Sequence, residues 1–141
     1  LDTYIHFVSE TYFEHTSKEY NEYELDMTDK CTKAIVMANP FILHAQPGAL
    51  SYLKDCGFKT FDKWWDESYD TVNNPEEKTE KLNNLFLELS NWSHDKWCST
   101  LKEMSTILTQ NYYTYYRIHT KVEYLKDIEK YIDDFVAKND K

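Results

Sequence analysis

The sequence predicts an α/β fold, a half-Rossmann arrangement with a parallel sheet, followed by a helical C-terminal tail. Over residues 1–72, short apolar runs suited to buried strands alternate with stretches of helical periodicity. Over residues 73–141, only helix signals remain. The resulting order, β-loop-α-β-α-β and then helices, favours parallel strands joined by right-handed crossovers. A chain of 141 residues is enough for one domain, so we expect the tail to pack on the α/β part.

The first strand is predicted at residues 4–8 (YIHFV), a continuous apolar run. The polar stretch that follows is predicted to be a loop over the strand's carboxyl end. Thr28 is suited to cap the first helix, and Asp29 then lies in its positive first turn. Apolar residues repeat at helical spacing over 31–38, and the Asn-Pro pair at 39–40 ends that helix.

A second strand is predicted at residues 41–45 (FILHA), followed by a turn in which Gly48 lets the backbone bend tightly. A helix is expected over residues 49–56, and Gly57 stands where a glycine commonly ends a helix. Residues 58–61 (FKTF) are predicted to form a brief third strand.

The tail begins with a strong helix signal. Asn74 is suited to the N-cap, Pro75 to the first helical position, and Glu77 to a capping box. Ser93 is predicted to cap the next helix. The predicted buried faces are Leu82, Leu85, Phe86 and Leu89; then Trp97, Leu101, Met104, Leu108 and Tyr112; and last Leu125, Ile128, Ile132 and Phe135.

Composition excludes several classes of protein. Lys and Arg number 16 against 25 Asp and Glu, a net charge of −9, so nucleic acid is not expected as a partner. Arg117 is the only arginine, which leaves phosphate recognition to lysine and backbone N–H groups. No apolar run reaches the ~18 residues of a membrane span. The three cysteines are widely spaced, predicting free thiols in a reducing cytoplasm and neither a disulfide framework nor a zinc site.

Three features each allow two interpretations. His44 is either a ligand or base, or a half-buried histidine with its hydrogen bonds satisfied. The acidic run at 64–70 (WWDESYD) either shares a proton or holds a metal, or is a solvated loop above packed tryptophans. The tyrosines of residues 111–118 form either a stacking platform or core with an exposed flank. The sequence favours the second, structural interpretation in each case. Two glycines are too few for a glycine-rich phosphate loop.

Four segments together resemble the C-terminal domain of a glycosyltransferase-like family found in phages, large viruses and marine bacteria. They are FVSETYFE (7–14), TDKCTKAI (28–35), NPFILHAQPGALSYLKDCGFKTF (39–61) and WWDESYD (64–70). The resemblance covers about residues 4–72. The TDK stretch is similar to the TEK nucleotide-sugar motif of fucosyltransferase-type enzymes with the GT-B fold. This chain has Asp29 in place of the motif's glutamate and Ala34 where a proline is usual.

The resemblance implies a role for each matching residue. Asp29 would hold the ribose, Lys30 the diphosphate and Lys33 a second phosphate contact, with Thr28 at the helix cap beside them. Glu10, after the first strand, would touch the sugar or the base. A helix N-terminus with an adjacent lysine neutralises a leaving diphosphate, so neither a metal nor another cofactor is expected.

Two functions follow. The first is the nucleotide-sugar-binding domain of a glycosyltransferase that transfers a sugar from a nucleotide diphosphate sugar to an acceptor hydroxyl. That reading needs a further domain for the acceptor, and the start at Leu1 suggests a piece of a longer protein. The alternative is a non-catalytic binding or structural module of the same fold, cytoplasmic or virion-associated if viral. Exposed Trp92, Tyr113 and Tyr116 would then form a protein interface.

Overall fold

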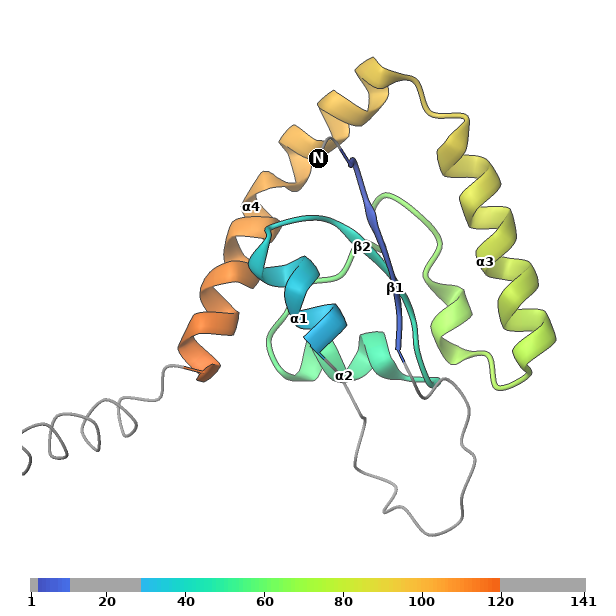
Figure 1. Cartoon of the computed structure of the whole chain (residues 1–141), viewed down its shortest axis with the longest axis horizontal. Helices are drawn as coiled ribbons and strands as arrows, with labels where there is room; N and C mark the ends of the chain where they lie inside the picture. The colour runs from blue at the N-terminus through green and yellow to red at the C-terminus, as the bar shows by residue number, and fades with distance from the viewer. Residues whose placement is uncertain (1–2, 11–28, 120–141) are drawn as a thin grey trace, which may run out of the picture.

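The structure is a computed structural model, and it describes residues 3–10 and 29–119. Two short strands and two short helices are followed by two longer helices (Figure 1). Their bounds are β1 His6–Ser9, α1 Asp29–Val36, β2 Phe41–His44, α2 Ala49–Asp55, the 3-10 turn η1 Ser68–Thr71, α3 Pro75–Ser90 and α4 His94–His119. The α/β class predicted from the sequence is confirmed.

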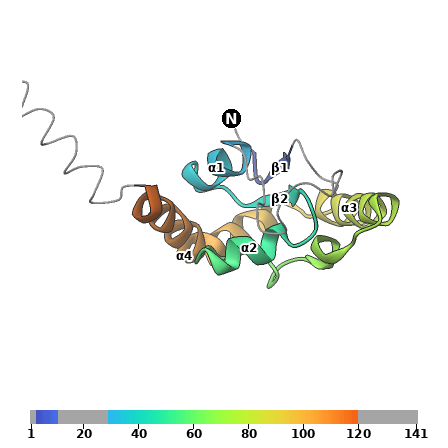
Figure 2. The ribbon, with the colours of Figure 1, turned by 90° about the horizontal axis from the view of Figure 1, so that it is seen from below.

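β1 and β2 pair in parallel, with His6 opposite Phe41 and Ser9 opposite His44. In both views, α1 and α3 lie on opposite sides of this strand pair (Figures 1 and 2). Phe7 on β1 meets Phe86 of α3 edge-on, with ring centroids 4.9 Å apart. Within the described residues the sheet therefore has two strands, with one helix on either side of it.

The prediction of a third strand at residues 58–61 is wrong. The amide of Asn111, on α4, takes the place of a neighbouring strand: its Oδ1 accepts from the Lys59 N–H at 2.7 Å, and its Nδ2 donates to the Lys59 carbonyl at 2.8 Å. The Phe61 N–H donates to the Glu67 carboxylate at 2.7 Å. Since side chains satisfy this backbone, no ladder forms there.

Helices α1 and α2 end in the same motif. After α1, the Asn39 N–H donates to the Ala34 carbonyl and the Ala38 N–H to the Ile35 carbonyl. After α2, Phe58 and Gly57 donate in the same pattern to residues 53 and 54. Both are Schellman motifs, which need a left-handed residue at their centre. Gly57 supplies it with φ 93°, as predicted, whereas the first motif uses Ala38 with φ 50°.

The start of α2 depends on a distant carboxylate. Its N-cap, Gly48, has φ 86° and no side chain to offer. Asp70 replaces the missing cap, because its carboxylate accepts from the N–H groups of Leu50 at 3.0 Å and Ser51 at 3.4 Å. The Gly48 N–H in turn donates to the Asp70 carbonyl. η1 is thereby attached to the first turn of α2.

The two long helices begin where predicted. Asn74 Oδ1 accepts from the N–H groups of Glu76 and Glu77, and Pro75 is the first residue of α3. Ser93 Oγ accepts from the Lys96 N–H at the start of α4. Leu82, Leu85 and Leu89 of α3 and Trp97 and Met104 of α4 are buried as predicted.

The C-terminal half of α4 differs from the prediction. Tyr112 is only half-buried, and the residues that face inward are Asn111 and Thr114. The apolar stripe predicted at residues 125–135 lies outside the described residues.

Candidate functional site

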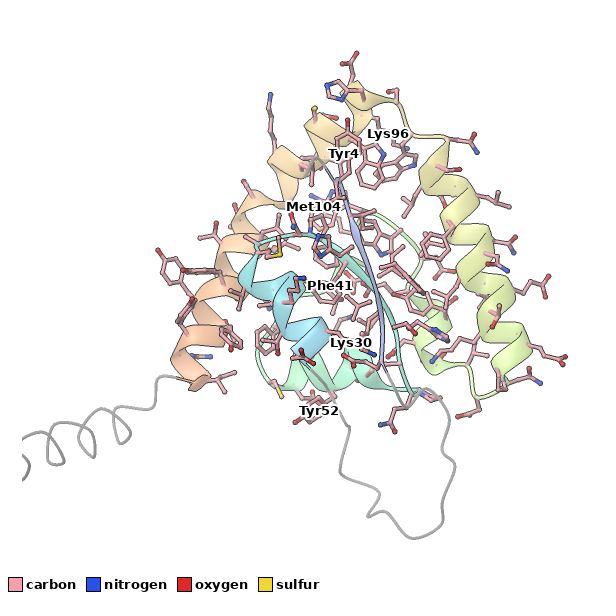
Figure 3. All side chains as sticks on the ribbon, viewed as in Figure 1. Tyr4, Lys30, Phe41, Tyr52, Lys96 and Met104 are labelled. Carbon is pink, nitrogen blue, oxygen red and sulfur yellow. The ribbon has the colours of Figure 1, made fainter. Side chains whose placement is uncertain are left out.

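Polar and charged side chains gather at the carboxyl ends of β1 and β2. Glu10 directly follows β1, is 2% exposed, and donates its N–H to the His44 carbonyl at 2.9 Å. Lys30 reaches the same end of β1 from the first turn of α1, where its Nζ donates to the Ser9 carbonyl at 2.9 Å (Figure 3). The structure therefore brings two of the predicted site residues, Glu10 and Lys30, to one strand end.

For the other predicted site residues in the described part of the chain, the structure shows no polar contact with the carboxyl end of β1. Asp29 is the first residue of α1 and is exposed. Lys33 is exposed in the last turn of α1. Lys33 comes three positions after Lys30, which places it about 4.5 Å further along the helix axis and away from the strand ends. Thr28 lies outside the described residues.

Lys78 of α3 was missed by the sequence analysis. It is 3% exposed, and its Nζ donates to the carbonyl of Ala45, the residue after β2. Burial lowers the pKa of its ammonium, while the negative charge of Asp70 acts in the opposite direction. The sequence does indicate its burial, because position 78 shares a helix face with the buried leucines at 82, 85 and 89.

His44, the last residue of β2, is half-buried. Its Nδ1 lies 3.4 Å from Ser9 Oγ on the neighbouring strand. Burial lowers the pKa of the imidazole, and the positive charge of Lys78 lowers it further. Both effects favour the neutral imidazole, and His44 has a hydrogen-bond partner, in keeping with the structural interpretation favoured from the sequence.

The acidic run at 64–70 serves the fold. Asp66 accepts from the N–H and hydroxyl of Ser68, both at 2.8 Å, and these bonds lower its pKa. Glu67 accepts from Thr60 and Phe61, and burial raises its pKa. Asp70 caps α2. Among the described residues, no group of three or more His, Cys, Asp or Glu side chains is placed to hold a metal ion.

The chemistry of this strand end follows from its charges. Two ammonium groups, on Lys30 and Lys78, lie at the ends of adjacent parallel strands, where open α/β sheets bind their ligands. Lys30 stands in the first turn of a helix, whose N–H groups and dipole favour an anion. Lys78 is too buried to make extensive contact with a ligand. Its charge still attracts an anion at the strand ends, because the surrounding protein has a low dielectric constant and screens the charge weakly. The site suits a small anion beside a carboxylate.

A hollow on the surface of α3 does not share this character. It contains two carboxylates and no cation, and it is lined by Pro75, Glu76, Thr79, Glu80, Asn83 and Asn84. Its acidic lining disfavours a phosphate-bearing ligand.

Comparisons with protein families, curated proteins and solved structures find no match for this chain. None of the helices in residues 29–119 is both long and apolar enough to cross a membrane.

Proposed function

We propose that this chain binds the nucleotide diphosphate part of a nucleotide sugar at the carboxyl ends of β1 and β2. The observation that carries the proposal is the placement of Lys30, in the first turn of α1, at the end of β1 beside Glu10. The half-Rossmann topology, expected from the order of strand and helix signals in the sequence, is part of the same proposal. The proposed reaction passes the sugar to an acceptor hydroxyl.

In this proposal the positively charged groups bind the phosphates and the carboxylates bind the sugar hydroxyls or the base. Lys30 and the N–H groups of the first turn of α1 hold the diphosphate, and Asp29 holds the ribose. Glu10 meets the sugar or the base. The second positive charge comes from Lys78, because Lys33 lies a turn further from the strand ends. Stabilisation of the departing diphosphate by these fixed charges is this chain's share of catalysis.

The proposal predicts a contrast between two lysines of one short helix. UDP, GDP, ADP and CMP are titrated against the chain and followed by NMR chemical-shift changes. We expect saturable binding by at least one diphosphate, with changes at residues 9–10 and 29–30. Lys30→Ala should weaken that binding by roughly tenfold or more, as expected for one charge-assisted contact of about 1–3 kcal/mol.

Lys33→Ala is the matched control, because both lysines are exposed on α1. It should weaken binding by less than about threefold, as for a distant screened charge. Equal effects of the two substitutions would refute the assignment of Lys30. Silence from all four nucleotides with a well-dispersed spectrum would refute the nucleotide site itself.

A second candidate function is a non-catalytic interaction module. Tyr113 is 66% exposed, Tyr116 40% and Ile118 38%, all on the C-terminal part of α4. Trp92, which was predicted to be exposed, is instead partly buried against the core, with its ring 4.8 Å from that of Trp97. Exposed tyrosines are typical anchors of protein interfaces. The absence of nucleotide binding, combined with concentration-dependent association that Tyr113→Ser abolishes, would favour this function.

A further inference from the structure

A second group of reactive side chains lies at the other end of the strand pair. Nε2 of His94, the first residue of α4, is 3.5 Å from Cys98 Sγ one turn later. Nδ1 of the same ring is hydrogen-bonded to the hydroxyl of Tyr4, just before β1. One imidazole therefore joins a thiol and a phenol, and Figure 3 shows Tyr4 beside the start of α4, well away from Lys30.

The phenol is held rigidly. The Tyr4 ring stacks on Trp97, with centroids 5.4 Å apart and planes 4° from parallel. Trp97 is itself 6% exposed and also packs against the ring of Trp92. The Lys96 ammonium lies over the Trp92 ring, 3.8 Å from its centroid. Because the core fixes Tyr4, the hydrogen bond to Nδ1 fixes the direction of the imidazole.

The present geometry can accommodate an ion pair between a Cys98 thiolate and a His94 imidazolium without moving either side chain. In the imidazolium form both ring nitrogens are donors. Nδ1 then donates to the Tyr4 oxygen and Nε2 to the Cys98 sulfur, at the contacts already present. A thiol beside a base that a third group orients is the arrangement that activates a cysteine nucleophile.

The other two cysteines lack this arrangement. Cys31 is 1% exposed, and burial, reinforced by the charge of Glu10, raises the pKa of its thiol to about 12. Cys56 is half-buried like Cys98, but its hydrogen-bond partner at the end of α2 is the hydroxyl of Tyr52 and not an imidazole.

We propose that Cys98 is a site of thiol–disulfide exchange with low-molecular-weight disulfides, with His94 as the base and Tyr4 as the positioning residue. Cys98 Sγ attacks one sulfur of the disulfide, a new S–S bond forms and the old one breaks. The thiol proton passes to His94 Nε2 and then to the departing thiolate, which leaves as a free thiol. The disulfide is the only oxidant needed, and the product is a mixed disulfide at Cys98.

The test compares the three thiols within one chain. The whole protein is exposed to glutathione disulfide at pH 7, quenched at intervals, and the modified fraction of each cysteine is measured by mass spectrometry of peptides. We expect Cys98 to react about tenfold faster than Cys56, because an adjacent imidazole takes up the proton of the attacking thiol at Cys98. Cys31 should stay unmodified and reports that the fold is intact.

Two variants separate activation from exposure. His94→Gln should bring the Cys98 rate to within about twofold of the Cys56 rate, because the base is gone. Tyr4→Phe retains the stack on Trp97 and should lower the Cys98 rate only partly, leaving Cys56 and Cys31 unchanged. Equal rates for Cys98 and Cys56 in the unmodified protein would overturn the proposal. An unchanged Cys98 rate in His94→Gln, with Cys31 still protected, would overturn it as well.

Discussion

Lys78 and His44 form a coupled pair at the strand ends. The ammonium is buried against the carbonyl after β2, and the imidazole belongs to the last residue of that strand. Burial lowers the pKa of both groups, and the lysine's charge adds to the effect on the histidine. The positive lysine therefore adds to the effect of burial in favouring the neutral form of His44. This favours His44 as a hydrogen-bonding group, or as a proton acceptor, over a second cation.

Replacement of Lys78 by methionine should raise the pKa of His44. The like charge disappears while most of the burial remains, so the pKa stays below the ordinary 6.5. The measurement is an NMR titration of the histidine ring protons. Lys96→Met is the control, because that lysine lies over Trp92 at the other end of the strand pair. A His44 pKa that stays constant or falls in Lys78→Met would contradict the coupling.

The same shift sets a pH dependence of stability. Because the pKa of His44 is lower in the folded than in the unfolded protein, the unfolded protein binds more protons just below pH 6.5. Stability is therefore full above that pH and falls as the pH drops through the folded pKa. In Lys78→Met the contribution of His44 to this loss should be smaller.

At the scale of single elements, the ends of α1 and α2 offer a matched comparison. Both helices finish in Schellman motifs, one centred on Ala38 and the other on Gly57. A left-handed backbone costs a residue with a Cβ about 1 kcal/mol, and glycine avoids that cost. The chain thus carries strain at Ala38 that it avoids at Gly57.

Ala38→Gly should accordingly raise the free energy of unfolding by about 0.5–1 kcal/mol, whereas Gly57→Ala should lower it by about 1 kcal/mol. Space does not dominate the second change, because a Cβ at Gly57 would meet its nearest side-chain atom, on Arg117, at 3.5 Å. Urea unfolding of both variants measures the pair. Destabilisation by Ala38→Gly would show that φ at residue 38 is not the source of strain.

Elements whose signals are local were predictable. Asn74 and Ser93 cap their helices as the sequence indicated, and Gly57 ends α2. Residues 58–61 look like a strand because they are short, apolar and bounded by a glycine. Their backbone partner is an amide 52 positions away along the chain, and no local pattern announces such a partner.

The site shows the same division. Glu10 and Lys30 could be placed together because both stand at element ends, and parallel strands bring those ends to one edge. Lys78 was missed because a lysine on a polar-looking helix start is normally solvated. Its place in the leucine row was the signal that went unused.

At the scale of the whole molecule, a two-stranded sheet contributes little independent stability, so the helices must supply most of the core. α3 and α4 flank the strand pair like two sides of an arch (Figure 1). One hydrophobic cluster extends from Val8 through Phe41 and Phe61 to Met104. Asn111 adds the polar connection, since it is 2% exposed and ties α4 to the backbone of Lys59.

Asn111→Ala should therefore destabilise the molecule by about 1–3 kcal/mol, because the part-buried N–H and carbonyl of Lys59 both lose their partner. Asn84→Ala on the exposed side of α3 is the control and should change stability by less than about 0.5 kcal/mol. Chemical denaturation of both variants tests the difference. A loss no larger than that of the control would mean that water replaces the amide at Lys59 without cost.

The buried ammonium of Lys78 also determines where α3 can rest. A row of leucines looks much the same after a slide of one helical turn, about 5.4 Å, so apolar contacts alone would tolerate several docked positions. The lysine tolerates one, since only there does its charge meet the carbonyl after β2. We expect its main effect to be selection among rival packings rather than added strength. Lys78 thus specifies the one position at which α3 docks, while the leucines supply the attraction.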